Sequence, residues 1–269
     1  MTGEAAPDEG AADGSERPAV GYALDGPVAW LTIDRPERRN ALSAEVRAGL
    51  WTGVRRFRDD VDAAVLVMTA AGDRAFCAGG DLKEMATETL RVPPPDYLPQ
   101  IGRNIEIDKP VIAAVNGVAY AGGFLLTQCA DLVVAAEHAR FAITEAKVGR
   151  GTPWAASLPY LLPPRVVMHM LLTGEPVSAR RGYELGLVNE VVPADQLRAA
   201  AHDLALRVAA NAPLSVRLAK QTVGLLARYP VERAYEEAER LWEPVYLSDD
   251  AQEGPRAFRE GRRPVWKGR

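Results

Sequence analysis

The chain has little of what metal and redox sites require. Its 269 residues include only two cysteines, Cys77 and Cys129, and three histidines. The cysteines lie far apart and match no zinc or redox spacing, and His138, His169 and His202 form no cluster with metal-ligand spacing. We therefore expect no metal site, and a reduced intracellular compartment fits the isolated cysteines.

Long apolar runs and a strong excess of one charge are also missing. No stretch approaches the ~20 uninterrupted apolar residues of a membrane span. The first residues are neither apolar enough for a secretory signal nor arginine-rich like a transit peptide, so we expect a cytoplasmic protein without a membrane partner. A net charge of −4 argues against nucleic acid as a partner. A phosphorylated ligand would need a local basic patch.

What is present is typical of a globular protein. A hydrophobic content of 48% with 25% charged residues predicts one large domain, or one domain with a small appendage. Residues 1–17 are rich in Ala, Gly, Glu and Asp without periodicity, which predicts a disordered tail. We expect a core over residues 18–195 and a helical region over residues 196–269.

Local patterns predict an α/β core. Two apolar segments, 19–24 and 28–33, flank Asp25–Gly26, which is a strong hairpin signal. Ser43 is expected to cap a helix that runs towards Arg58. Strands and helices then alternate through Val192, the rhythm of a wound sheet. The proline-rich stretch 87–99 cannot be regular helix.

After Pro193 the pattern becomes helical. Residues 194–210, 214–228 and 231–247 predict three helices, which Pro213 and Pro230 separate. Their apolar faces cannot all be buried within so small a group. We therefore expect these helices to pack on the main domain or on another subunit.

The stretch from Lys109 to Asp131, KPVIAAVNGVAYAGGFLLTQCAD, organises the rest of the chain. It predicts a buried strand over 111–115, a turn at Asn116–Gly117 and a helix over 124–129 after the pair Gly122–Gly123. This geometry aims free backbone N–H groups at one point, where a phosphate or a developing oxyanion can bind. A simple close-packing turn is the alternative interpretation of two such glycines.

A second glycine segment and a lone carboxylate extend the pattern. AFCAGGD (75–81) follows an apolar strand over 63–69, and Glu145 lies in FAITEAKVG. Here the sequence resembles the crotonase superfamily, which is the enoyl-CoA hydratase/isomerase family. The resemblance covers residues 20–267, and the matching segments are RPERRNALS (35–43), AFCAGGDLKEM (75–85), KPVIAAVNGVAYAGG (109–123), CADLVVAAEHARFAITEAKVG (129–149) and LLTGEPVSARRGYELGLVNEVVP (171–193).

The resemblance implies a fold, a substrate and an assembly. The fold would be α/β, a crotonase (ClpP-like) spiral of ββα units with a C-terminal helical region. That region builds trimers, often stacked as hexamers, so a homotrimer or a dimer of trimers is expected. The substrate would be an acyl-CoA thioester, with coenzyme A entering as part of the substrate and no separate cofactor.

The resemblance also implies an oxyanion hole. The thioester carbonyl oxygen gains negative charge when a proton leaves the α-carbon, and two backbone N–H donors stabilise the enolate, each by roughly 3 kcal/mol if the subtilisin precedent transfers. By position in the matched motifs the donors are Gly80 and Gly122. The residues expected to contact coenzyme A are Arg38, Asn40, Ala41, Ala78, Gly80, Lys83, Gly122 and Lys267.

The carboxylates depart from the family pattern. Hydratases of the family carry two glutamates, and the first of these positions is Leu125 here, while the second is Glu145. Adding water needs a base and an acid, whereas one carboxylate can take a proton from C2 of a 3-enoyl-CoA and return it at C4. Mitochondrial 3,2-enoyl-CoA isomerases of the family share the apolar residue and the single glutamate. Isomerisation is therefore favoured, with Glu145 as the catalytic residue.

Other interpretations stay open. They are a hydratase with a relocated acid, another crotonase reaction such as decarboxylation or hydrolysis, and a weakly active acyl-CoA-binding subunit. Glu145 alone also fits an ion pair with Lys147 or Arg150. The apolar Phe141, Ile143 and Trp154 close to it favour a dry pocket and a raised pKa.

Several further side chains are weaker candidates for the chemistry. Glu84 and Glu88 are candidates for a relocated acid, although exposed helix glutamates are the simpler interpretation. Tyr97, Tyr120 and Gln128 are candidates to donate a proton or hold water, although structural roles are favoured for each. Cys77 is expected to be a packing residue rather than a nucleophile.

Overall fold

The N-terminal hairpin forms where the sequence predicts it. The computed structural model describes residues 18–87 and 92–269, so the predictions for residues 1–17 and for Glu88 lie outside the described part. Strands β1 (Val20–Asp25) and β2 (Val28–Ile33) pair antiparallel around the turn at Gly26, whose φ is +56°. Glycine suits this turn because a positive φ is costly for residues with a side chain.

The strands form two sheets. The six-stranded sheet has the order β1-β2-β3-β5-β7-β10, and its other strands are β3 (Val65–Ala70), β5 (Val111–Val115), β7 (Leu132–Ala136) and β10 (Glu190–Val192). The four-stranded sheet has the order β4-β6-β8-β9, with β4 (Ala75–Cys77), β6 (Val118–Tyr120), β8 (Arg140–Ala142) and β9 (Val177–Ser178). Among the strands that the structure describes, the pairs β1–β2 and β8–β9 are antiparallel and the other pairs are parallel.

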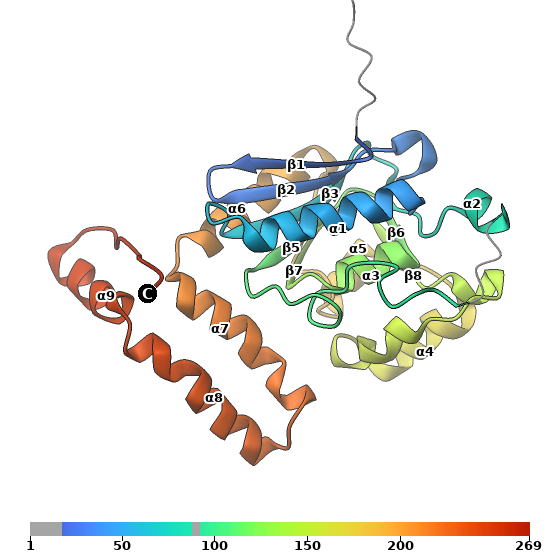
Figure 1. The fold of residues 1–269 in the computed structure, drawn as a ribbon. Coiled ribbons are helices and arrows are strands. Elements are labelled where there is room, and N and C mark those ends of the chain that lie inside the picture. Colours follow the sequence, from blue (N-terminus) through green and yellow to red (C-terminus); the bar gives the residue numbers. More distant parts are fainter. Residues whose placement is uncertain (1–17, 88–91) are drawn as a thin grey trace, which may run out of the picture.

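Successive chain segments repeat one unit. Each of β3, β5 and β7 enters the large sheet, and the strand that follows it, β4, β6 or β8, enters the small sheet. A helix comes next: α2 (Leu82–Thr87), α3 (Gly122–Gln128) or the 3-10 helix η2 (Glu145–Val148). The predicted spiral of ββα units is confirmed (Figure 1).

Helix α1 (Ala44–Asp59) covers one face of the large sheet (Figure 1). It begins at Ser43, as predicted, because the Ser43 Oγ accepts a hydrogen bond from the amide of Val46. Its apolar stripe, which includes Leu50 and Phe57, is fully buried in the main core. The ammonium of Lys109 donates to the carbonyl of Asp60 at 2.7 Å and so satisfies a backbone acceptor at the C-terminal end of α1.

Helix α6 (Leu197–Ala209) covers the other face of the large sheet. Its residues Leu197, Ala201 and Ala205 pack with Val67 and Ile112 in a second apolar core. Helix α6 is therefore an integral part of the sheet domain. The remaining helical segments of the domain are η1 (Pro36–Arg38), η3 (Pro153–Tyr160), α4 (Pro164–Thr173), α5 (Ala179–Glu184) and η4 (Ala194–Gln196).

A C-terminal arm, residues 213–260, projects from the sheet domain (Figure 1). It consists of α7 (Pro213–Val223), η5 (Leu225–Ala227), α8 (Val231–Tyr246) and α9 (Asp249–Glu260). The sequence predicts helices over 214–228 and 231–247, which correspond to α7 and α8, and predicts none for α9, which contains Pro255. Helix α9 begins at Ser248, whose Oγ accepts from the amide of Ala251.

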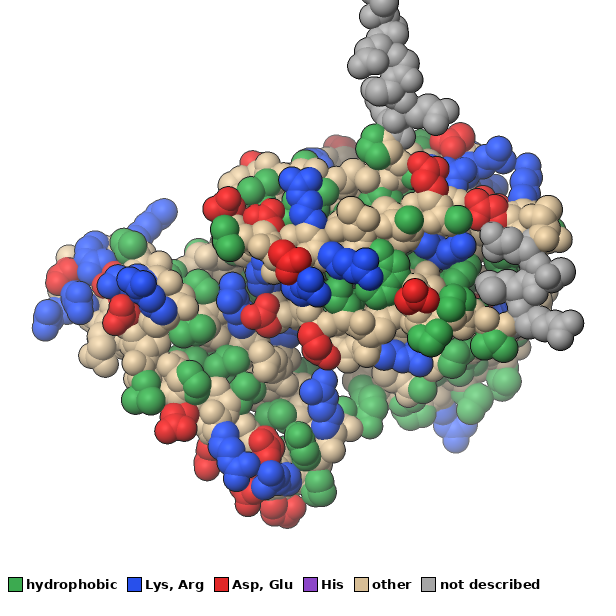
Figure 2. Space-filling model, in the orientation of Figure 1, with side chains coloured by type: hydrophobic (Ala, Val, Ile, Leu, Met, Phe, Trp, Pro, Cys, Tyr) green, Lys and Arg blue, Asp and Glu red, His purple; other side chains and the backbone are tan. Residues whose placement is uncertain are grey.

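The arm exposes large apolar side chains. Val223 is 85% exposed, Leu247 79% and Phe258 90%, and Figure 2 shows hydrophobic side chains scattered among charged ones over this part of the surface. The predicted surplus of apolar surface is present on this chain. The expected trimer stays a prediction. Within residues 18–87 and 92–269, no helix has the length and apolar character that crossing a membrane requires.

Candidate active site

A cavity of about 960 Å³ lies where the matched segments meet. Such a volume fits a substrate-sized ligand, because ligand pockets span roughly 300–1,000 Å³. The segments that line it lie at 38–42, 78–85, 92–104, 120–125 and 144–154. Gly80, Gly122 and Glu145, which the sequence places far apart, all line this cavity.

The N–H group of Gly80 points away from the neighbouring segment that contains Leu42. The amide of Leu42 donates to the carbonyl of Gly79 at 2.8 Å. In a trans peptide the C=O and N–H groups point in opposite directions, and no cis peptide occurs in the described chain. Because the Gly79 carbonyl points at Leu42, the Gly80 N–H points away from it.

The Gly122 amide lies at the first position of α3. Ala121 precedes it with a φ of +51°, and its carbonyl accepts the first helical bond, from Leu125 at 3.0 Å. The Gly122 N–H therefore points out of the N-terminal end of α3. Free N–H groups and the positive end of the helix dipole meet there, which suits a developing negative charge.

A side chain at either glycine would require a neighbouring side chain to shift. A Cβ at Gly122 would lie 2.5 Å from Cδ1 of Leu42, and one at Gly80 would lie 2.6 Å from Sδ of Met85. Both contacts are shorter than real Cβ contacts. The two glycines thus let a ligand approach the backbone closely.

Glu145 is the first residue of η2 and is 8% exposed. Burial raises the pKa of this carboxyl above its ordinary value, while hydrogen bonds lower it in part. The indole Nε1 of Trp154 donates to Glu145 Oε1 at 3.1 Å, and Oε2 is buried without a partner among the described residues. The dry, pKa-raising surroundings predicted for Glu145 are present.

One other carboxylate among the described residues lines the cavity. Asp81 Oδ1 accepts from the amides of Lys83 at 3.0 Å and Glu84 at 3.4 Å, so it caps the start of α2. Leu125, which is 6% exposed, lines the cavity on α3. The cavity therefore presents a single described carboxylate that is not engaged in capping a helix.

The residues expected to contact coenzyme A divide into two groups. Arg38, Ala41, Ala78 and Lys83 line the cavity with the two glycines. Asn40 does not line it. Its side chain is buried, accepts from the amide of Arg35, and donates to the carbonyls of Ala71 and Ala75 at 3.0 and 2.7 Å. Its side chain thus fixes the backbone beside the cavity, a role that the sequence analysis missed.

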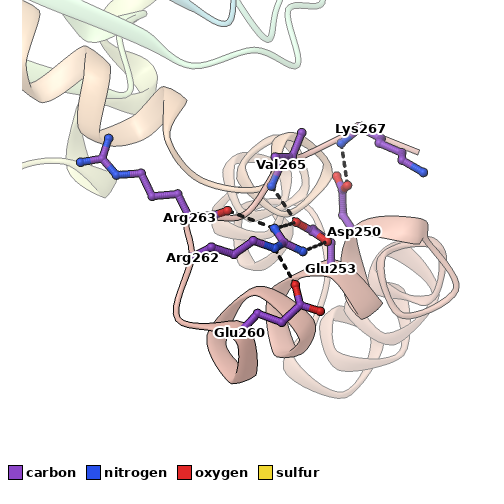
Figure 3. A network of polar contacts seen from close by, with 7 residues as sticks. All are labelled: Asp250, Glu253, Glu260, Arg262, Arg263, Val265 and Lys267. Carbon is purple, nitrogen blue, oxygen red and sulfur yellow. Dashed lines mark hydrogen bonds and ion pairs between the residues drawn. The ribbon is translucent and has the colours of Figure 1, made fainter.

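Lys267 lies in the C-terminal segment rather than in this cavity. Its amide donates to Asp250 Oδ1 at 2.7 Å, and its ammonium lies 3.3 Å from Asp249. Figure 3 shows the same segment anchored by Arg262, which binds Glu253 through two hydrogen bonds of 2.6 and 3.0 Å. These contacts tie residues 262–268 to α9.

Tyr97 and Tyr120 line the cavity, and several of the weaker candidates have structural partners. Glu84 Oε2 accepts from the amide of Ala44 at the start of α1, and Arg47 donates to the Tyr97 hydroxyl at 3.2 Å. Burial raises the pKa of Cys77 to about 12, so its thiol stays protonated, as expected for a packing residue. Gln128 donates to the carbonyl of Trp154 at 3.2 Å.

The histidines do not gather in space. His169 pairs with Glu175 on the surface, and His202 stacks against Trp30. Within the described part of the chain, no group of three His, Cys, Asp or Glu side chains is arranged to hold a metal ion.

Comparison with known proteins identifies the class. A sequence model described as enoyl-CoA hydratase/isomerase matches residues 24–269. The carnitinyl-CoA dehydratase of Salmonella typhi is 39% identical over 255 residues, which cover 91% of this chain and 97% of that protein. An enoyl-CoA hydratase from Mycobacterium tuberculosis superposes with a TM-score of 0.86 at 35% identity, over 94% of this chain and all of that chain.

A more distant structure has the same fold. The enoyl-CoA hydratase from Bacillus anthracis gives a TM-score of 0.84 at 29% identity, over 93% of this chain and 100% of that chain. The chain belongs to the enoyl-CoA hydratase/isomerase family and has the crotonase fold. It is an acyl-CoA enzyme of that family.

Proposed function

We propose that the protein moves the double bond of a 3-enoyl-CoA into conjugation, forming a 2-enoyl-CoA. One observation carries the proposal. Leu125 and Glu145 line one cavity, and Glu145 is its single described carboxylate that does not cap a helix. One proton carrier is sufficient for isomerisation, while hydration needs a base for water and an acid for carbon.

The substrate would lie with its thioester oxygen between the amides of Gly80 and Gly122. These donors are fixed before the reaction, so they stabilise the enolate without reorganising. The acyl chain would extend along the apolar lining, which includes Leu98 and Trp154. Arg38 and Lys83 would supply positive charge for the phosphates of coenzyme A, which enters only as part of the substrate.

The reaction then needs two proton transfers through one group. Glu145 takes the proton from C2, the C2–H bond breaks, and its electron pair passes into the dienolate. The Glu145 carboxylic acid next gives a proton to C4, where a new C–H bond forms and the double bond settles between C2 and C3. Nothing is oxidised or reduced, and the carboxylate is regenerated.

Dehydration or hydration is the second candidate. The Salmonella typhi relative is named a dehydratase, and several structural neighbours are named hydratases. Loss of water from a 3-hydroxyacyl-CoA needs an acid near the leaving hydroxyl group. Leu125 stands where the resembled family has its first glutamate. The acid for the hydroxyl group would therefore have to come from another residue of the cavity.

The test uses both substrate types. The purified protein is incubated separately with a 3-enoyl-CoA and a 2-enoyl-CoA in deuterated water, and both reactions are followed by NMR. We expect rapid double-bond migration without a 3-hydroxyacyl-CoA. Formation of the 3-hydroxy product at a comparable rate would refute the isomerase assignment and favour the second candidate.

A further inference from the structure

We propose that Trp154 is the positioning residue of the active site, because its indole N–H holds the Glu145 carboxylate for proton transfer. This inference rests on the proposed role of Glu145 as proton carrier. The bond joins Trp154 Nε1 to Glu145 Oε1 at 3.1 Å, and Trp154 itself lines the cavity. Among the described residues, no other side chain donates a hydrogen bond to this carboxylate.

Trp154 is held from the oxyanion side of the site. Gln128 donates to the Trp154 carbonyl at 3.2 Å, and the indole packs edge-on against Phe124, with ring centroids 6.1 Å apart at 88°. Gln128 and Phe124 both belong to α3, whose first amide is that of Gly122. Helix α3 therefore fixes the position of the base, through Trp154, relative to the oxyanion donor.

Glu145 needs such a donor because it is buried and no ion pair joins it to another of the described residues. Burial is the largest influence on its pKa and raises it, and the opposing influences, in descending order, are hydrogen bonds from the backbone of Glu145, from the side chain of Trp154 and from the backbone of Thr144. The titratable or charged side chains on η2, in the segment that follows it and on the adjoining β6, β8, η3 and α4 are Tyr120, Arg140, Lys147, Arg150, Tyr160, Arg165 and His169. The charged side chains of other elements that line the same cavity are Arg38, Arg39, Asp81, Lys83 and Arg103. Arg140, Lys147, Tyr160, Arg165 and His169 are exposed to solvent.

Trp154→Phe removes the N–H group and keeps an apolar ring. A hydrogen bond from the indole favours the charged form of the carboxylate, so its loss should raise the pKa of Glu145. The acid limb of the kcat profile should then move to higher pH by about one unit. The plateau kcat should fall at least about tenfold because the carboxylate is less well oriented, while KM should change less than about threefold.

Two variants separate this role from packing. Trp242→Phe removes an indole bond of 2.9 Å, to Thr222 in the C-terminal arm, and should leave the pH profile unchanged. Phe124→Leu disturbs the packing of the indole but keeps its N–H group. It should lower thermal stability and move the acid limb less than Trp154→Phe does, because the indole N–H group is still present to bind Glu145.

A second measurement makes the test independent of the overall reaction. Exchange of the C2 protons of hexanoyl-CoA with deuterated water needs only the base and the oxyanion hole. Suppose that the protein exchanges the C2 protons of hexanoyl-CoA but does not move the double bond of a 3-enoyl-CoA, and that the acid limb of exchange moves in Trp154→Phe. The isomerase proposal then fails and the role of Trp154 stands. If Trp154→Phe leaves the acid limb and the plateau of exchange unchanged, the role of Trp154 is refuted.

Discussion

Leu125 on α3 and Glu145 at the start of η2 line the same cavity, and both side chains are more than nine-tenths buried. In the hydratases that the sequence resembles, both positions carry a carboxylate. In this chain the first position is the apolar Leu125 and the second is the acidic Glu145. That asymmetry is the main reason to assign this chain a reaction with one proton carrier.

Leu125→Glu should supply the missing acid. We expect the variant to gain hydration of a 2-enoyl-CoA, at least about tenfold above the wild-type rate, because acid–base catalysis contributes 10²–10⁴-fold. Burial of the new charge should cost roughly 3 kcal/mol of stability at neutral pH. Product analysis and thermal unfolding measure the two effects. Leu125→Gln is the matched control, and a gain of hydration there would show that a carboxylate is not what matters.

Gly122→Ala should impair the oxyanion hole. The new Cβ would lie 2.5 Å from Leu42 Cδ1 and 3.3 Å from Leu98 Cδ1. Either the backbone donor or the Leu42 side chain must shift, and Leu42 is buried and tightly packed, so part of the strain should fall on the donor. A misplaced donor should lower kcat about 10- to 100-fold. Gly224→Ala, whose Cβ meets only the Gln221 carbonyl at 3.6 Å, is the control and should keep full activity. An equally small effect in both variants would argue against Gly122 as a donor.

Glu145→Gln should reveal the cost of burying the base. Because burial raises the pKa of Glu145 in the folded protein, the folded state binds a proton more tightly than the unfolded state. Wild-type stability should therefore fall, relative to the variant, as the pH rises from roughly 4.3 through the raised pKa. Thermal unfolding of both proteins across pH 4–8 measures this difference. A constant difference across that range would contradict the raised pKa.

Local signals predict much of the fold because they act over few residues. Asp25–Gly26 determines the hairpin and Ser43 determines the start of α1, as the structure confirms. Helix α9 is missed because its proline and acidic residues are typical of a loop. Its capping residue Ser248 and the contacts of Arg262 with Glu253 stabilise it nonetheless.

The candidate site is predicted less completely because its contacts join distant segments. Motif order alone suffices to bring Gly80, Gly122 and Glu145 together. It cannot show that Asn40 binds the carbonyl of Ala75, 35 positions away, instead of lining the cavity. Nor does it show the hydrogen bond from Trp154 to Glu145, because that bond depends on how η2 and η3 pack.

The most direct test of the central claim compares Glu145 and Asp81, the two carboxylates among the described residues that line the cavity. Double-bond migration in a 3-enoyl-CoA is measured for wild type, Glu145→Gln and Asp81→Asn. The account predicts a loss of about 10³-fold in Glu145→Gln, because its proton carrier is gone. Asp81→Asn should stay within about tenfold, because asparagine still caps α2. Equal losses in both variants, or a Glu145→Gln protein that keeps its activity, would contradict the account.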